Sequence, residues 1–303
     1  MTVENAETFF EKATDPISSG RRRWQRFARN RMAVVSLVIV VIAAVAAIAA
    51  PFIAPHDPNA ISYGRALEGP SAEFWLGTDI LGRDLLSRLL SGLRTALFIA
   101  VSAELLALAL ALVVGVTAGY LGGRADQILM SATDVMYAFP TYLFAVILTA
   151  VLGRSPGAMI VAIAVGSWLT QARILRAQII RLKSFEYIEA GRSMGAGPMT
   201  LIARYMLPNA LGPVLVTTAF GIPAAMLAEA GLAILGLGVD PPEASLGSMI
   251  TEGYKYVMVQ PNLILWPFLL FATLLLAFTW IGDGVRDAYD TNEVGDVDGP
   301  VVH

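Results

Sequence analysis

Six long apolar segments restrict the folds open to this chain more than any other feature. They cover residues 33–54, 95–121, 128–152, 157–172, 210–237 and 263–281. A helix needs about 20 mostly apolar residues to cross a bilayer, and only helices and closed barrels satisfy their backbone hydrogen bonds in lipid. Only 15% of the residues are charged, against about 25% in soluble domains. The sequence therefore predicts an all-α integral membrane protein with six transmembrane helices.

Basic residues are unevenly distributed between these spans. With the N terminus in the cytoplasm, fifteen of the 21 Lys and Arg residues fall in cytoplasmic segments and six fall outside. This bias follows the positive-inside rule. It predicts that residues 1–32 and 285–303 are cytoplasmic and that residues 55–93 are external. The acidic tail at 285–303 is expected to be disordered.

An arginine cluster directly precedes the first span. A signal peptide also begins with basic residues, but no small-residue cleavage site follows here, and residues 33–54 are long enough to span. We expect the cluster to fix the orientation of the chain and to contact anionic lipid headgroups, rather than nucleic acid.

The segment at 184–208 is a polar interruption between the fourth and fifth spans. The fourth span is expected to continue into it as a basic helix. Two short helices should follow, because Gly195 and Gly197 can end the first and Pro198 suits the start of the second. Pro208 is expected to end the second helix, since proline lacks a backbone N–H and clashes with the preceding turn.

Neither of these helices is long enough to be stable alone in water. The apolar positions available to them are Ile188, Ala190 and Met194 in the first and Leu201, Ile202 and Tyr205 in the second. Such faces need a partner surface. A groove on another protein is one solution, and the membrane surface is the alternative.

The same segment resembles the EAA loop of ABC-importer permeases, through its Glu-Ala-Gly triplet, a turn glycine and a closing Leu-Pro pair. In that family the loop forms coupling helices that dock on the ATPase subunits. The resemblance implies that these residues shape or contact the docking surface: Glu189, Ala190, Gly191, Gly195, Arg204, Tyr205, Leu207 and Pro208. Gly191 stands where the family usually has alanine, and Tyr205 where isoleucine or histidine is more common.

A second motif, FWLGTDILGRD, lies in the external segment and resembles dipeptide and oligopeptide permeases, a family that also includes nickel permeases. Gly77 and Gly82 permit tight turns, and Asp84 and Arg88 have the spacing of a helical i,i+4 ion pair. We therefore expect an amphipathic helix here, with a structural role rather than direct contact with substrate. The motif residues are Trp75, Gly77, Thr78, Asp79, Gly82, Arg83 and Asp84.

Further phrases near the C terminus, GLAILGLGVDPPEASLG and FTWIGDGVRDAYD, resemble the same permeases. The resemblance thus covers roughly residues 20–290, with the transmembrane domain at 94–284. It implies the type I importer permease fold.

Several polar or small residues inside the predicted spans also need an explanation. A carboxylate in a membrane is costly unless it has a partner or faces a cavity. Asp134 can reach polar surroundings near the end of its helix, whereas Glu229 is expected to hydrogen-bond a neighbouring helix. Glu104 is the candidate for a water-filled path, where it would attract the ammonium group of a peptide. Gly115 and Gly119 would allow close approach of another helix.

The chain lacks the residues of an enzyme site. It has no cysteine, its histidines are His56 and His303, and the GxxxxGK[ST], HExxH and GxSxG patterns are absent. We therefore expect no metal and no cofactor on this chain, and a separate energy source.

The resemblance implies the missing parts. These are a homologous permease as heterodimer partner, two ABC ATPase subunits carrying ATP and Mg, and an extracytoplasmic solute-binding protein, at the inner membrane of a prokaryote. The expected cargo is a dipeptide or oligopeptide, with nickel complexes and other small solutes left open. The alternative is a proton-coupled secondary transporter that uses the three intramembrane carboxylates.

Overall fold

The computed structural model describes residues 16–289, and its regular structure there is helical. In chain order the helices are α2 (Pro16–Arg29), α3 (Arg31–Ile53), α4 (Leu85–Leu121), α5 (Gly123–Tyr137), α6 (Thr141–Leu152), α7 (Pro156–Lys183), α8 (Glu186–Ser193), α9 (Pro198–Thr200), the π-helical segment η1 (Leu201–Met206), α10 (Leu207–Ile234), α11 (Leu246–Tyr254) and α12 (Asn262–Tyr289). The tail that was expected to be disordered lies outside the described residues from position 290 onward.

Five helices within the described range are long and apolar enough to cross a membrane: α3, α4, α7, the continuous α9–η1–α10 helix and α12. A sixth span exists only if α5 and α6 are counted together, and these two helices meet at 83°. The single straight helix expected at 128–152 is therefore broken. Pro140 explains the break, because it disfavours the helical conformation in the residue before it, and α6 begins directly after it.

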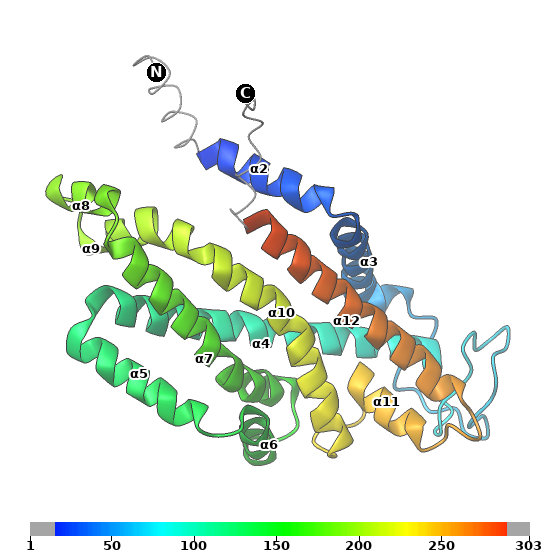
Figure 1. Ribbon diagram of the computed structural model, residues 1–303. Helices are drawn as coiled ribbons and strands as arrows, with labels where there is room; N and C mark the ends of the chain where they lie inside the picture. Colours follow the sequence, from blue (N-terminus) through cyan, green and yellow to red (C-terminus); the bar gives the residue numbers. More distant parts are fainter. Residues whose placement is uncertain (1–15, 290–303) are drawn as a thin grey trace, which may run out of the picture.

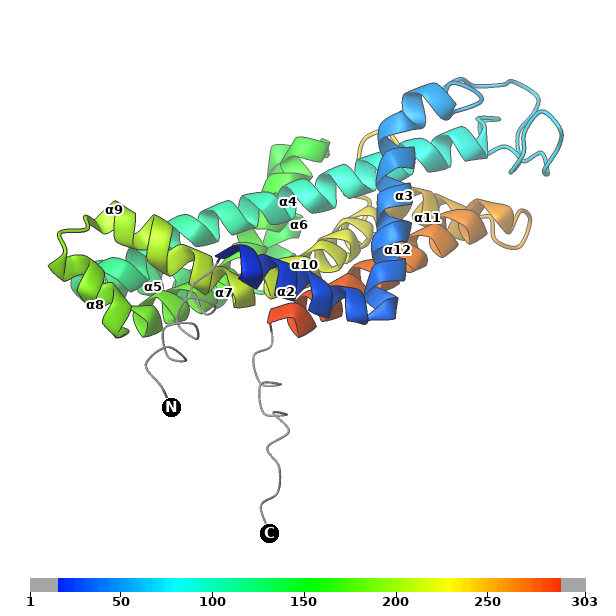
Figure 2. The ribbon, with the colours of Figure 1, turned by 90° about the horizontal axis from the view of Figure 1, so that it is seen from above.

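The two motif-bearing regions lie at opposite ends of the molecule. Figures 1 and 2 show α4, α7 and α10 running alongside one another, with α8 and α9 at one end. The loop at 54–84, α11 and the α11–α12 connection gather at the other end. That loop contains no helix, and α4 begins at Leu85 and runs on as the second span. The amphipathic helix expected within 55–93 is therefore formed only from Leu85 onward, as the first turns of α4.

Small residues bring α4 and α7 close together. A Cβ atom added to Gly115 would lie 2.6 Å from the carbonyl oxygen of Ala172, and one added to Gly119 would lie 2.9 Å from that of Arg176. Helices in membranes associate largely through such close packing. The prediction from the GxxxG pattern is confirmed, and α7 also continues to Lys183 as the expected basic extension.

Candidate functional site

The turn after α8 is built around Gly195. Its φ angle is +85°, and no heavy atom lies within 4 Å of the position that a Cβ atom would occupy. The N–H of Gly195 donates to the Arg192 carbonyl and the N–H of Ala196 to the Gly191 carbonyl, both at 3.0 Å. This pair of bonds is a Schellman ending, which requires a left-handed residue. Backbone conformation, rather than space, therefore selects glycine at this position, and the predicted turn is confirmed.

The second helix of the loop does not end at Pro208, where its end was expected. The helix continues through α9, η1 and α10 without a break. Within η1 the backbone widens, so that the N–H of Leu207 donates to the carbonyl of Ile202, and the side-chain amide of Asn209 donates to the Tyr205 carbonyl at 2.7 Å. A π turn shifts the upstream carbonyls and lets a proline enter a helix. The prediction of a helix end was therefore wrong.

Apolar contacts anchor α8 to the rest of the protein. Ile188, Leu201 and Met206 are fully buried. Ile188 and Met206 share a cluster with residues of α7 and α10, namely Leu175, Ile179, Leu182, Ala210 and Val214. A Cβ atom added to Gly191 would lie 3.2 Å from Leu201 Cδ2. Glycine in place of the family's usual alanine thus relieves a tight contact between α8 and η1.

The outer tip of the same loop exposes apolar side chains. Met194 is 80% exposed and Met199 is 76% exposed. Met194 therefore does not share the buried face of Ile188, which corrects the expected pairing. Methionine side chains adapt readily to a partner's surface. Among the other loop residues, Glu189, Ala190, Arg204 and Pro208 are exposed, and Tyr205 and Leu207 are half-buried.

Glu104 lies between three helices. It is fully buried in α4, and Gln171 of α7 donates a hydrogen bond to its Oε1 atom. A Cβ atom added to Gly221 of α10 would overlap the Glu104 carboxylate. In this conformation Glu104 thus packs at a junction of α4, α7 and α10. Its partner Gln171 was missed, because an amide in a span has no distinctive spacing.

Glu229, a residue of α10, lies beside the N-terminus of α11. The Ser245 hydroxyl donates to Glu229 Oε1 at 2.6 Å, and the same hydroxyl accepts from the Ser248 N–H at 3.0 Å as the N-cap of α11. A negative charge is favourable beside a helix N-terminus. Glu229 therefore has the helix-linking position expected for it. Helix α11 itself was missed, although serine at both 245 and 248 is a capping signal.

Ion pairs join α5 to α7. Arg173 Nη2 lies 2.7 Å from Asp134 Oδ1, and Arg176 makes two contacts with the Asp126 carboxylate at 2.5 and 2.6 Å. The Arg173 guanidinium also lies 4.2 Å from the ring centroid of Tyr137. The Asp134 side chain is exposed, as its expected position near polar surroundings suggested, but its arginine partner was not foreseen.

The FWLGTDILGRD motif and the start of α4 form a buried charge network. Arg83 Nε donates to Asp79 Oδ2 at 2.6 Å, and Arg88 Nε lies 3.3 Å from the same oxygen. Asp84 instead caps α4 by accepting from the Ser87 N–H at 2.9 Å. The expected pair between Asp84 and Arg88 is not formed, because the capping role turns the Asp84 carboxylate away and Arg88 reaches back to Asp79.

Two glycines fold the loop that carries this network. Gly77 and Gly82 have φ angles of +90° and +74°, and a Cβ atom on either would overlap a backbone carbonyl of the neighbouring loop. The N–H of Glu68 donates to Thr78 Oγ1 at 2.9 Å. Trp75, in contrast, is exposed. Most of the motif is therefore internal scaffold, as expected.

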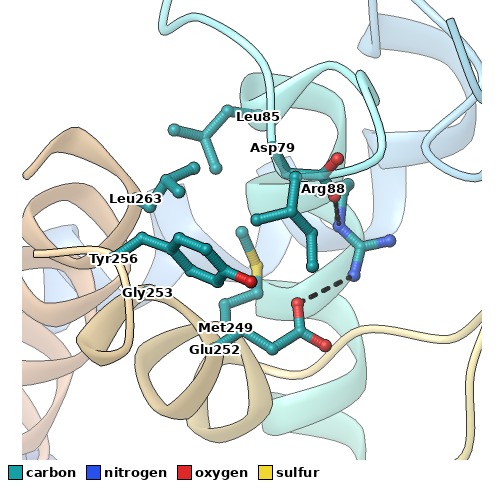
Figure 3. A pocket seen from close by; sticks show the side chains of 9 residues that line it. Asp79, Leu85, Arg88, Met249, Glu252, Gly253, Tyr256 and Leu263 are labelled. Atoms are coloured by element: carbon teal, nitrogen blue, oxygen red, sulfur yellow. Dashed lines mark ion pairs between the residues drawn. The ribbon is translucent and has the colours of Figure 1, made fainter. Parts of the chain in front are cut away.

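A small pocket lies beside this network, between the start of α4, α11 and α12 (Figure 3). Arg88 Nη2 lies 3.9 Å from Glu252 Oε2 across it. Its remaining labelled lining includes Leu85, Met249 and Tyr256. Within residues 16–289 no group of three or more His, Asp or Glu side chains is placed to hold a metal ion. In this pocket Arg88 lies between the carboxylates of Asp79 and Glu252.

Outside the network, Arg65 contacts Glu73 at 2.7 Å. The hydrogen bond from this arginine holds the pKa of the Glu73 carboxyl below its usual range.

Comparison with known proteins agrees with this architecture. Residues 111–292 match the family described as binding-protein-dependent transport system inner membrane component. Residues 18–70 match the N-terminal TM domain of oligopeptide transport permease C. A solved structure titled as inward-facing conformations of the MetNI methionine ABC transporter aligns with 68% of this chain and 96% of that chain, at a TM-score of 0.51 and 21% identity, which shows a shared fold.

Curated relatives cover most of the chain. The glutathione transport system permease protein GsiD of Pectobacterium atrosepticum is 36% identical, over 89% of this chain and 90% of the relative. The oligopeptide permease OppC of Bacillus subtilis is 37% identical (88% and 87% covered), and the nickel permease NikC of Escherichia coli is 36% identical (88% and 97%). The chain therefore belongs to the binding-protein-dependent inner-membrane permeases of ABC importers.

Proposed function

We propose that this chain forms one half of the translocation path of an ATP-driven importer for dipeptides or oligopeptides. A homologous permease supplies the other half, two ABC ATPase subunits bind ATP and Mg, and an extracytoplasmic binding protein delivers the solute. The observation that carries the proposal is the loop from α8 to η1. It is anchored on its inner side by Ile188 and presents Met194 and Met199 outward.

This loop is suited to pass a movement into the membrane. Because Ile188 packs in one cluster with Met206, and η1 continues directly into α10, a push on α8 displaces the whole helix. Helix α10 in turn meets Glu104 through Gly221 and contacts α11 through Glu229. The ATPase partners hydrolyse ATP, and this chain transmits the resulting movement from α8 to α10.

The choice of a peptide cargo rests on the range of the relatives. Their names include glutathione, oligopeptide, dipeptide and nickel transport, and three of these four cargoes are peptides. The structure offers no metal-ligand cluster within its described part. We propose that the binding protein makes the finer selection among peptide-like solutes.

The test compares valine substitutions at two glycines that both have an open Cβ position. The two glycines differ in the backbone conformation that the new residue must adopt. Gly195→Val places a branched residue at φ +85°, which is strongly disfavoured. Gly197→Val is the matched control, because its backbone is extended at φ −70° and ψ 164° and its Cβ position is also open. The tagged chain is purified in mild detergent, and the proteins that accompany it are identified by mass spectrometry.

Recovery of a second permease and ABC ATPases with the unmodified chain and with Gly197→Val, but loss of the ATPases from Gly195→Val, is the expected result. Equal ATPase recovery from both variants would contradict the docking role of the turn. Recovery of the chain alone, with proton-driven uptake in liposomes, would replace the importer by a secondary transporter.

A further inference from the structure

The region before the first span concentrates positive charge. Residues 20–31 include six arginines and no acidic residue. Arg21, Arg29 and Arg31 are exposed, and none of the three forms an ion pair with any residue in the described range. Three guanidinium groups are thus available to a ligand that carries negative charge.

Helix α2 is held in one orientation, so the exposed face has a defined direction. Phe27 is buried against Gly284 of α12, where an added Cβ atom would lie 2.8 Å from its ring. Asn30 joins α2 to two neighbours, since its amide donates to Asp287 of α12 at 2.9 Å and its carbonyl oxygen accepts from the Ala33 N–H at 3.1 Å. Figures 1 and 2 both show α2 beside the end of α12.

An apolar surface adjoins the charged face. Trp24 is 60% exposed, on the same outward side of α2 as Arg21, three residues away. Met32 and Val35 then begin a stripe of exposed apolar side chains that follows α3 as far as Phe52. Exposed arginines, an exposed tryptophan and a long aliphatic stripe thus follow one another along α2 and α3.

We propose that the α2–α3 junction is a binding site for an anionic phospholipid. Arg21, Arg29 and Arg31 bind the phosphate, since guanidinium groups bond phosphate oxygens in pairs. Trp24 lies at the headgroup level, and the acyl chains follow the stripe on α3.

An anionic lipid fits this surface better than a free phosphate or the acidic residues 290–303. A free phosphate would use the arginines but leave Trp24 and the stripe uncovered. Residues 290–303 carry four carboxylates, yet their largest apolar side chain is valine. Of these three occupants, only a lipid carries both a negative charge and a large apolar part.

The test measures lipid retention by the full chain purified with its partners. The protein is reconstituted in nanodiscs of phosphatidylglycerol and phosphatidylcholine, re-extracted, and its bound lipids are counted by mass spectrometry. The triple variant R21Q/R29Q/R31Q should lower the preference for phosphatidylglycerol by about tenfold or more, because each basic residue near an anionic surface contributes about fivefold. The corresponding lysine triple keeps the charge but not the paired hydrogen bonds, so its preference should lie between those of the glutamine triple and the unmodified protein.

A matched control removes the same charge elsewhere. Arg124, Arg181 and Arg192 are three exposed arginines outside α2, and their glutamine triple should retain phosphatidylglycerol as the unmodified protein does. Equal loss in both triples would mean that net charge, not this site, holds the lipid, and no loss in either would also overturn the proposal.

Two further outcomes identify a different occupant. Displacement of the lipid by millimolar inorganic phosphate would mark a free-phosphate site. If phosphatidylglycerol is enriched only after residues 290–303 are removed, the acidic tail occupies the surface and the lipid proposal is wrong.

Discussion

At the scale of single residues, the two buried carboxylates in the spans are bound by neutral donors. Glu104 accepts from the Gln171 amide and Glu229 from the Ser245 hydroxyl, whereas Asp79, in the loop at 54–84, is bound by arginines. Burial of an ionised group needs such hydrogen bonds, because an unpaired one is costly in a low-dielectric surrounding. Each carboxylate also joins different helices, so its loss affects packing between elements.

Glu229→Ala should therefore destabilise the protein, by about 1–3 kcal/mol, the cost of leaving a buried hydroxyl such as that of Ser245 without its acceptor. Glu229→Gln keeps a carbonyl oxygen for Ser245 and should cost less. Thermal unfolding of the purified protein in detergent measures both. Equal melting temperatures for Glu229→Ala and the unmodified protein would show that this contact does not support α11.

At the scale of elements, the association of α4 with α7 depends on two glycines. Gly115→Ala would bring a methyl group to 2.6 Å from the Ala172 carbonyl, so the helices would have to separate. We expect a loss of about 1–3 kcal/mol, as for other overpacked interiors.

The matched control for this substitution is Gly157→Ala at the start of α7. No atom lies within 4 Å of the Cβ position there, and its φ angle is not in the left-handed region. This variant should keep its stability or gain slightly. A Gly115→Ala protein as stable as the control would show that α4 and α7 can shift without cost.

Some elements could be predicted from the sequence because local properties determine them, and others could not because tertiary contacts determine them. The spans followed from apolar length, since lipid leaves the backbone little choice, and the turn at Gly195 followed from its left-handed geometry. The helix end predicted at Pro208 was wrong because the π-helical turn of η1 accommodates the proline within a continuous helix. No local sequence pattern indicates such a turn. The Asp79–Arg88 contact is a tertiary contact that depends on how the loop folds, and α11 is too short for its periodicity to be visible.

At the scale of the whole molecule, the loop from α8 to η1 and the charge network around Asp79 lie at opposite ends. The positive-inside rule predicts that the end with α8 faces the cytoplasm and that the end with the charge network faces outward. Because the sequence contains no cysteine, each end can be labelled by a single introduced thiol without any background.

Met194→Cys and Tyr63→Cys form the matched pair for this test, since both side chains are at least 80% exposed, one at each end. In intact cells a membrane-impermeant maleimide should label only Tyr63→Cys, because the positive-inside rule predicts that its loop lies outside. Met194→Cys should react only after the membrane is opened, and association with the ATPases should then protect it. Labelling of Met194→Cys in intact cells would invert the proposed orientation, and with it the docking of any cytoplasmic partner on α8.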